Sequence, residues 1–297
     1  MSHLVTPRAP KYECGDVEAL HFSKYEGLGN DFIVVDGAGG PDARPIGPAD
    51  AMVLCDRHFS VGADGVLLAG VRGKTAFMRV LNADGSEAEM CGNGLRCVVV
   101  HLLRRGLVTG DAFTVDTAAG PHGVRIVRRG TASAIVEVEM RAPSFVPTEI
   151  PVRADAPLVD LPVDVGGRTL RITAVSMGNP HAVTFDDVSP DDRAVLGPKL
   201  ERDARFPQGV NVGFARVRED GGLDLAVWER GVGFTLACGT GACAAAAAAV
   251  ETGRAERGVP IDVTLPGGPL SVRIGAPGEP ARMTGPARHV FDGTLSR

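Results

Sequence analysis

The chain has 297 residues, 44% of them apolar, and a formal net charge of -5. The length is about twice that of a common domain and the apolar content can fill two cores, so we expect two compact units. Scattered basic residues and few aromatic ones argue against a nucleic-acid partner, and the longest run of small or apolar residues, 242–250, is too short to span a membrane.

The first half of the chain is predicted to mix strands with two helices. Residues 1–19 are expected to form a polar extension, and the first strand signal is the apolar run 32–35. A helix is predicted over about 49–57, and a second helix follows Cys91 and ends at Gly106, because glycine favours the conformation that closes a helix. The other strands are expected at 75–81, 113–117 and 135–140.

The second half is predicted to repeat this order after a proline-rich link. The stretch 141–143 and the prolines at 147 and 151 favour extended chain, so the boundary between the halves is placed there. This gives a first domain at 20–138 and a second at 139–283. Strands are expected at 173–176, 182–185, 223–228 and 261–265, around an alanine-rich helix at about 241–252.

Two short segments, one in each half, are near copies of each other. CGNGLRC begins at Cys91 and CGTGAC begins at Cys238, 147 positions later, and each precedes an apolar helical run. In nearly the same register, Gly29-Asn30 falls on Gly178-Asn179, Asn82 on Glu229 and Gly106 on Gly253. Several matches at one offset indicate an internal duplication of domain size.

The duplicated cysteines indicate acid-base chemistry on a bound carboxylate. A thiol at a helix start lies beside unpaired N–H groups and the positive end of the helix dipole, which lower the thiol pKa and attract carboxylates. The glycines at 92, 94, 239 and 241 let the backbone approach a ligand closely. If the two helix starts face each other, one thiolate can remove an alpha proton while the other thiol supplies one to the opposite face. That reaction inverts a stereocentre.

Cofactor and compartment signals agree with unassisted thiol chemistry. The six cysteines form no C-x-x-C pair and the first residues contain no apolar core typical of a secretory signal, so a reducing cytoplasm is expected. No nucleotide-binding or zinc-binding motif occurs, and none of the four lysines has the context of a pyridoxal site, so neither a cofactor nor a metal is predicted. Cys55, Cys97 and Cys243 are predicted to be packing residues, and Cys14 lies in the extension.

Five separated segments resemble the signature motifs of the diaminopimelate epimerase family. They are GLGNDFIVVD at 27–36, NADGSEAEMCGNGLRC at 82–97, SMGNPH at 176–181, ERGVG at 229–233 and ACGTGACAA at 237–245. The resemblance implies an α/β fold of two pseudo-symmetric domains, each a curved mixed sheet around a central helix. It places the active site in the cleft between the domains and returns segment 284–297 to the first domain.

The resemblance also implies an activity and an assembly. It implies a cofactor-independent isomerase that interconverts LL- and meso-2,6-diaminopimelate and so supplies lysine and peptidoglycan precursors. It suggests a homodimer in which Phe291 is a candidate interface residue.

Roles follow from the resemblance at matching positions. Cys91 and Cys238 correspond to the two catalytic cysteines, and His181 and Glu229 to groups that tune or orient them. The implied substrate contacts are Asn30, Asn82, Asn179, Asn211, Glu229 and Arg230, with the backbone donors of Gly92, Asn93, Gly239 and Thr240. The chain departs from the family's pattern at two positions, Phe234 in place of the usual glutamate and Gly65 where relatives can carry glutamine.

Several of these residues have a structural interpretation as well. Asn30 and Asn179 could adopt left-handed turns, and His181 could be a structural histidine. Glu229-Arg230 could be a surface ion pair, and Asp84-Gly85 a hairpin turn.

Three alternative functions remain open. A proline racemase or hydroxyproline epimerase also uses paired cysteines, but here Gly-Asn-Gly rather than Gly-His follows Cys91, and Ala237 rather than proline precedes Cys238. A thiol switch closed by a Cys91–Cys238 disulfide and a non-catalytic amino-acid-binding protein are the two alternatives without an activity.

Overall fold

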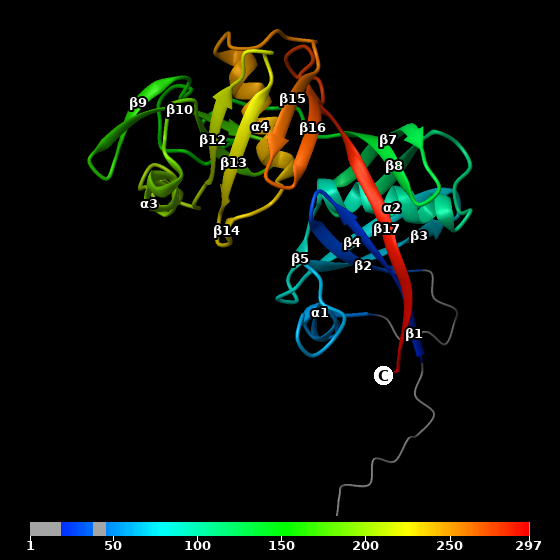
Figure 1. Cartoon of the computed structure of the whole chain (residues 1–297). Helices are drawn as coiled ribbons and strands as arrows, with labels where there is room; N and C mark the ends of the chain where they lie inside the picture. The colour runs from blue at the N-terminus through cyan, green and yellow to red at the C-terminus, as the bar shows by residue number, and fades with distance from the viewer. Residues whose placement is uncertain (1–18, 38–45, 297) are drawn as a thin grey trace, which may run out of the picture.

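The computed structural model describes residues 19–37 and 46–296, which form two lobes joined by one shared strand (Figure 1). Within these ranges there are four helices and seventeen strands, and every strand is hydrogen-bonded into one continuous mixed sheet. Residues 1–18 of the predicted extension, with Cys14, lie outside the described residues. None of the helices in the described ranges is both long and apolar enough to cross a bilayer.

The first lobe is a curved sheet that surrounds α2. Its elements are β1 (Ala19–Gly27), β2 (Asn30–Asp36), α1 (Pro48–Cys55), β3 (Gly65–Arg72), β4 (Thr75–Asn82), β5 (Glu87–Ala88), α2 (Gly92–Arg104), β6 (Ala112–Thr117), β7 (Gly120–Arg129) and β8 (Ser133–Glu139). Helix α2 is buried for most of its length and contacts strands on several sides. It ends as predicted, since Gly106 has a φ of 67° and its N–H bonds to the carbonyl of Leu103.

The second lobe repeats this arrangement around α4. Its elements are β9 (Leu161–Val165), β10 (Arg168–Ser176), β11 (Pro180–Thr184), α3 (Pro190–Glu201), β12 (Asn211–Val217), β13 (Leu223–Glu229), β14 (Gly233–Phe234), α4 (Gly239–Glu251), β15 (Ile261–Leu265) and β16 (Gly268–Arg273). The alanines of α4 are almost all inaccessible, and their short side chains let β10 to β13 and β15 to β16 pack close to the helix.

Strand pairing shows the internal duplication directly. In the first lobe β2–β3 is parallel, β3–β4 antiparallel and β4–β6 parallel. In the second lobe β11–β12, β12–β13 and β13–β15 pair in the same sequence of directions. The predicted fold class, with two similar curved sheets that each enclose a helix, is therefore confirmed.

The final strand, β17 (Arg282–Ser296), belongs to both lobes. It pairs with β16 at its beginning, with β8 over residues 282–288, and with β1 from Arg288 to its end. Figure 1 shows it as the long red strand that descends from the second lobe along the first. The domain boundaries expected at 138 and 284 stay predictions, although this pairing agrees with a returning C-terminal segment.

The predicted strands and helices all occur, most of them longer than expected, but several elements were missed. The strand at 32–35 was expected to be the first, whereas β1 precedes it and pairs with both β2 and β17. Helix α3 and the long strand β17 were not predicted either, nor were the strands β3, β5, β7, β9, β12, β14 and β16.

Candidate active site

The two duplicated cysteines are the N-cap residues of the two central helices. Cys91 precedes α2 and Cys238 precedes α4, both with extended backbone angles. The Sγ atom of Cys91 accepts a hydrogen bond from the N–H of Gly94 at 3.4 Å, and that of Cys238 from the N–H of Gly241 at 3.3 Å. Each thiol therefore takes the place that a serine or aspartate side chain usually has at a helix start.

The two helix starts meet at the junction of the lobes. The side-chain amide of Asn93, in the first turn of α2, donates to the carbonyl of Ala237, the residue before Cys238, at 3.2 Å. Met283 of β17 lies against both helices, because a Cβ added to Gly92 would be 2.8 Å from its Cε and one added to Gly239 would be 3.1 Å from its Sδ. The backbone N–H groups in the first turns of α2 and α4 therefore lie close to each other.

Both thiols have a raised pKa, which corrects the expectation from the helix starts. Cys238 is 5% exposed, and burial followed by the charge of Glu229 raises the pKa of its thiol. Burial also raises the pKa of the Cys91 thiol, against the opposing effects of the Gly94 N–H and the Arg96 charge. The helix start does favour the thiolate, but loss of hydration outweighs it.

Glu229 is held beside Cys238 by a neighbouring hydroxyl. Thr235 donates its side-chain hydrogen bond to the Glu229 carboxylate at 2.5 Å. Phe234, the first of the two departures named above, packs edge-on against Trp228 with ring centroids 5.2 Å apart. The departure at Phe234 therefore leaves the contact between Thr235 and Glu229 intact.

His181 is a buried, neutral histidine in this structure. Burial, with the charge of Arg230, lowers the pKa of His181 to about 3. Its Nε2 lies 3.0 Å from the Oδ1 of Asn179, an acceptor, so Nε2 carries the proton. The amide nitrogen of Asn179 in turn lies 3.4 Å from the hydroxyl of Thr240 in the first turn of α4. His181 accordingly fixes the orientation of Asn179.

Asn211 and Arg230 are joined through the backbone. The Asn211 amide donates to the Pro180 carbonyl at 2.9 Å and accepts from the Arg230 N–H at 3.0 Å. The Arg230 guanidinium donates to the carbonyl of Gln208 at 2.8 Å. The alternative of a surface ion pair between Glu229 and Arg230 is wrong for this structure, since no such pair occurs among its described residues.

Asn30 faces Cys91 and is held by an acidic residue. Its Oδ1 lies 4.0 Å from the Sγ of Cys91 and 3.3 Å from the Asn93 amide, while its amide nitrogen donates to Asp64 at 2.7 Å. Left-handed backbone is carried by the preceding Gly29, with a φ of 80°, and not by Asn30. Asn179 likewise follows a left-handed glycine, so the alternative of asparagine-led turns is wrong.

Asn82 is the last residue of β4, at the start of the turn that leads to β5. Its amide donates to the Ser86 hydroxyl at 2.9 Å, and Gly85 has a φ of 83°, so Asp84-Gly85 does form a hairpin turn. Gly65, the second departure, pairs with Asn82 in the sheet. A Cβ at Gly65 would lie 2.9 Å from the carbonyl of Leu81, so the local backbone has no room for a side chain there.

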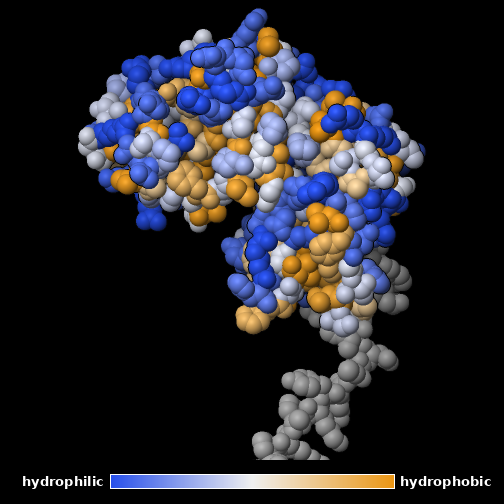
Figure 2. All heavy atoms as spheres, in the orientation of Figure 1, coloured by the Kyte–Doolittle hydropathy of each residue, from blue (hydrophilic) through white to orange (hydrophobic). Residues whose placement is uncertain are grey.

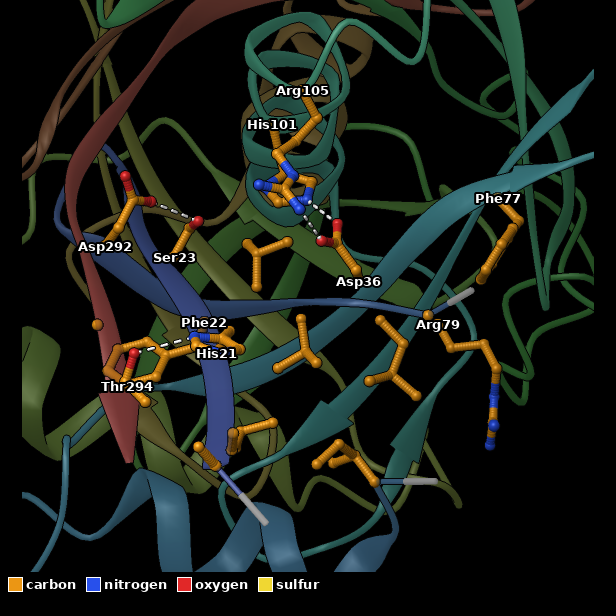
Figure 3. A pocket seen from close by; sticks show the side chains of 18 of the residues that line it. His21, Phe22, Ser23, Asp36, Phe77, Arg79, His101, Arg105, Asp292 and Thr294 are labelled. Atoms are coloured by element: carbon orange, nitrogen blue, oxygen red, sulfur yellow. Dashed lines mark hydrogen bonds and ion pairs between the residues drawn. The ribbon is translucent and has the colours of Figure 1, made fainter. Parts of the chain in front are cut away.

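A large cavity of about 850 Å³ lies away from the cysteines, at the end of the first lobe (Figure 3). In it His101 and Arg105 of α2 point toward Asp36, at 2.9 and 2.5 Å. None of the predicted site residues lines it. In the described part of the chain no group of three histidine, cysteine or acidic side chains is placed to hold a metal ion.

Sequence reasoning missed three residues that shape the site. Asp64 orients Asn30, Met283 separates the two helix starts, and Arg96 lies fully buried beneath the first turn of α2. Arg96 carried a usable signal, because a charged residue stands inside an otherwise apolar run after Cys91. Asp64 and Met283 carried none, since their proximity to the site depends on strand pairing.

A sequence profile and curated relatives both match this chain to the same family. The sequence profile described as "Diaminopimelate epimerase" matches residues 22–146 and 173–290. A curated diaminopimelate epimerase of Thermosynechococcus vestitus is 46% identical over 289 residues, covering 93% of this chain and 99% of that protein. "Diaminopimelate epimerase 1" of a Nostoc species is 44% identical over 285 residues, covering 93% and 100% of the two chains.

Solved structures with lower identity share the fold. A hydroxyproline epimerase from Agrobacterium vitis with bound trans-4-hydroxy-L-proline is 17% identical, with a TM-score of 0.64 and coverage of 94% and 92%. A phenazine biosynthesis protein of the PhzF family from Bacillus anthracis is 16% identical, with a TM-score of 0.67 and coverage of 94% and 100%. Since the sequence matches are extensive and specific while these likenesses concern the fold alone, the chain belongs to the diaminopimelate epimerase family.

Proposed function

We propose that this protein is a cofactor-independent epimerase that interconverts LL- and meso-2,6-diaminopimelate with Cys91 and Cys238 as its two acid-base groups. The observation that carries the proposal is the pair of cysteine N-caps on helix starts that the Asn93 side chain joins. The curated relatives that share 44% to 46% of its sequence have this activity in their names.

The substrate carboxylate at the reacting centre binds between the two helix starts. The first N–H groups of a helix have no partner within the helix, and the dipole adds positive charge there. The backbone donors of Gly92, Asn93, Gly239 and Thr240 can therefore hold the two carboxylate oxygens. This places the alpha carbon between the sulfur atoms, with one thiol on each face.

The two cysteines can carry out both proton transfers without any other reagent. The thiolate of one cysteine takes the alpha proton as the C–H bond breaks, and the thiol of the other gives its proton to the opposite face of the carbanion. After turnover the two sulfur atoms have exchanged protonation states, so the reverse reaction uses the same pair in opposite roles. Glu229 and His181 act on this pair through charge and through the orientation of Asn179.

The far end of the substrate meets the surplus polar groups of the site. Asn30, Asn82, Asn179, Asn211 and Arg230 exceed what one carboxylate and one amine require, and they favour a long substrate with a second amino-acid end. We further propose that the enzyme forms a homodimer and acts in lysine and peptidoglycan precursor synthesis. We assign it to the cytoplasm, because its thiols must stay reduced.

A proline or hydroxyproline epimerase is the second candidate, since a protein of that kind shares the fold. The Asn93 amide that joins the helix starts stands where such enzymes are expected to carry histidine, which argues against it. The test is to incubate the reduced protein separately with LL-diaminopimelate and L-proline and to separate the stereoisomers by chiral chromatography. We expect the meso isomer and no D-proline, and turnover of proline alone would reverse the assignment.

A further inference from the structure

Arg96 is a charged side chain enclosed in the interior of the protein. It is 0% exposed, and no carboxylate of the described residues lies within ion-pairing distance of its guanidinium. Its Nε donates to the carbonyl of Pro286 at 3.0 Å, and its Nη1 lies 3.4 Å from the carbonyl of Gly92 and 3.9 Å from the Sδ of Met283. Burying a cation that is hydrogen-bonded only to neutral groups lowers the stability of the fold. A functional role for Arg96 would explain why it is buried there.

The surrounding backbone is shaped to admit this guanidinium. A Cβ added to Gly27 of β1 would lie 3.4 Å from its Nη2, and one added to Gly285 of β17 would lie 3.3 Å from its Nε. Glycines from two strands thus lie against the guanidinium. The backbone of these strands therefore leaves space for the guanidinium in the interior of the protein.

The Arg96 head group determines which way the Asn93 amide points. Its Nη2 donates to the Oδ1 of Asn93 at 2.9 Å. This leaves the Asn93 nitrogen to donate to the Oδ1 of Asn30 and to the carbonyl of Ala237. The chain of contacts therefore runs from the buried cation across the start of α2 to the residue before Cys238.

The duplication shows that this cation is placed on one side of the thiol pair. In the shared register, Thr240 replaces Asn93 and Cys243 replaces Arg96 in the second half. The charged counterpart there is Glu229, which stands where the first half has Asn82. The charge of Arg96 favours the thiolate of Cys91, while Glu229 acts most strongly on Cys238.

The other ionisable groups around Arg96 do not cancel its charge. They are the thiols of Cys97 and Cys243, whose pKa values burial raises, and Glu26 of β1. The carboxylate of Glu26 is bonded instead to Arg288, at 3.0 Å.

We propose that Arg96 is a positioning residue of the epimerase that holds Asn93 across the two helix starts and places a positive charge on the Cys91 side of the thiol pair. The proposal rests on the proposed function for its effect on turnover, but its effect on the thiols can be measured without any substrate.

The test compares Arg96→Met, Arg96→Lys and Asn93→Ser with the control Arg104→Met. Arg104 lies on the same helix, at an exposed position 3.6 Å from Asp292 and away from the cysteines. Peptide-resolved mass spectrometry would follow iodoacetamide alkylation of Cys91 and Cys238 from about pH 6 to about pH 10. Thermal denaturation of each variant and kcat with diaminopimelate would be measured in parallel.

For Arg96→Met we expect a folded protein in which the pH midpoint of Cys91 alkylation rises by about one unit or more, while that of Cys238 changes less. Its kcat should fall about 100-fold, the size of effect typical of losing an oriented donor. Arg96→Lys should restore the Cys91 midpoint but not kcat, because an ammonium lacks the planar fork. Asn93→Ser should lower kcat and leave the Cys91 midpoint near that of the parent.

Two results would overturn the proposal. One is a folded Arg96→Met protein whose Cys91 midpoint and kcat equal those of Arg104→Met. The other is an Arg96→Met protein that fails to fold while Arg96→Lys and Asn93→Ser keep the parent kcat, which would make Arg96 purely structural. If the parent itself does not epimerise diaminopimelate, the proposed function fails, and the alkylation midpoints still decide the role of the charge.

Discussion

At the scale of single residues, the two thiols show opposing physical effects. The helix start supplies N–H groups that favour the thiolate, whereas burial removes the water that would solvate it. Burial prevails at both Cys91 and Cys238. The free enzyme is therefore expected to hold its thiols protonated to a higher pH than an exposed cysteine would.

The raised pKa of the two thiols predicts how the activity changes with pH. The active form needs one thiolate, and a raised thiol pKa keeps both protons on until the pH approaches that raised value. We expect kcat/KM for LL-diaminopimelate to rise with pH, by about tenfold per unit below the first thiol pKa. Initial rates with circular dichroism spectra at each pH would test it, and a kcat/KM that stays constant between about pH 6 and about pH 8 would contradict it.

The identities of the candidate site residues could be predicted from sequence, but the partners of their side chains could not. Cys91 and Asn93 lie in one short segment, so the pattern alone groups them. The contact of Asn93 with Ala237 joins positions 144 residues apart, and the contact of Asn30 with Asp64 depends on how β2 lies against β3. The sequence shows that a histidine stands at position 181, but it does not show that burial keeps this side chain neutral.

At the scale of elements, the helix α4 was predicted from its pattern, whereas β1 and α3 were missed because their patterns are irregular. The alanine run of α4 combines strong helix propensity with small size, and no other structure suits it. Strand β1 was missed because its buried stretch contains the polar Ser23 and Lys24. Helix α3 was missed because it has no clear apolar face and contains Pro198. Polar burial and internal proline are local conflicts that only tertiary contacts resolve.

The close packing of α4 predicts sensitivity to added volume. Ala246 is fully buried between the helix and the surrounding sheet, so Ala246→Leu is expected to lower the free energy of unfolding by about 1–3 kcal/mol. The matched control is Ala49→Leu, at an exposed position of α1, where a change within about 0.5 kcal/mol is expected. Urea denaturation would measure both, and equal losses in the two variants would show that α4 is not tightly enclosed.

At the scale of the whole molecule, the duplication is modified where β17 crosses between the lobes. The strand carries Met283 between the helix starts and Pro286 against Arg96, then continues along β1. One strand thereby connects the curved sheets of both lobes and also contacts the candidate site. Beyond it, β17 exposes Val290 and Phe291, and Figure 2 shows apolar side chains gathered on this part of the first lobe.

This exposed apolar region predicts the surface used for the proposed homodimer. Phe291 is 45% exposed while its ring meets Phe22 edge-on, so it can pack against a second copy without leaving its own lobe. Phe291→Asp is expected to convert the dimer to a monomer in sedimentation velocity, while Val232→Asp, an exposed apolar position of the second lobe, should leave the dimer intact. A parent protein that sediments as a monomer would refute the dimer.

The central claim is that two thiols on opposite faces of one substrate carry the reaction. The most direct measurement is NMR of LL-diaminopimelate in heavy water with the reduced, metal-free and pyridoxal-free protein, alongside Cys91→Ser and Cys238→Ser. The account predicts the meso isomer with deuterium at one alpha carbon for the parent and loss of epimerisation in each variant. Epimerisation that survives in either variant, or no exchange by the intact folded parent, would contradict it.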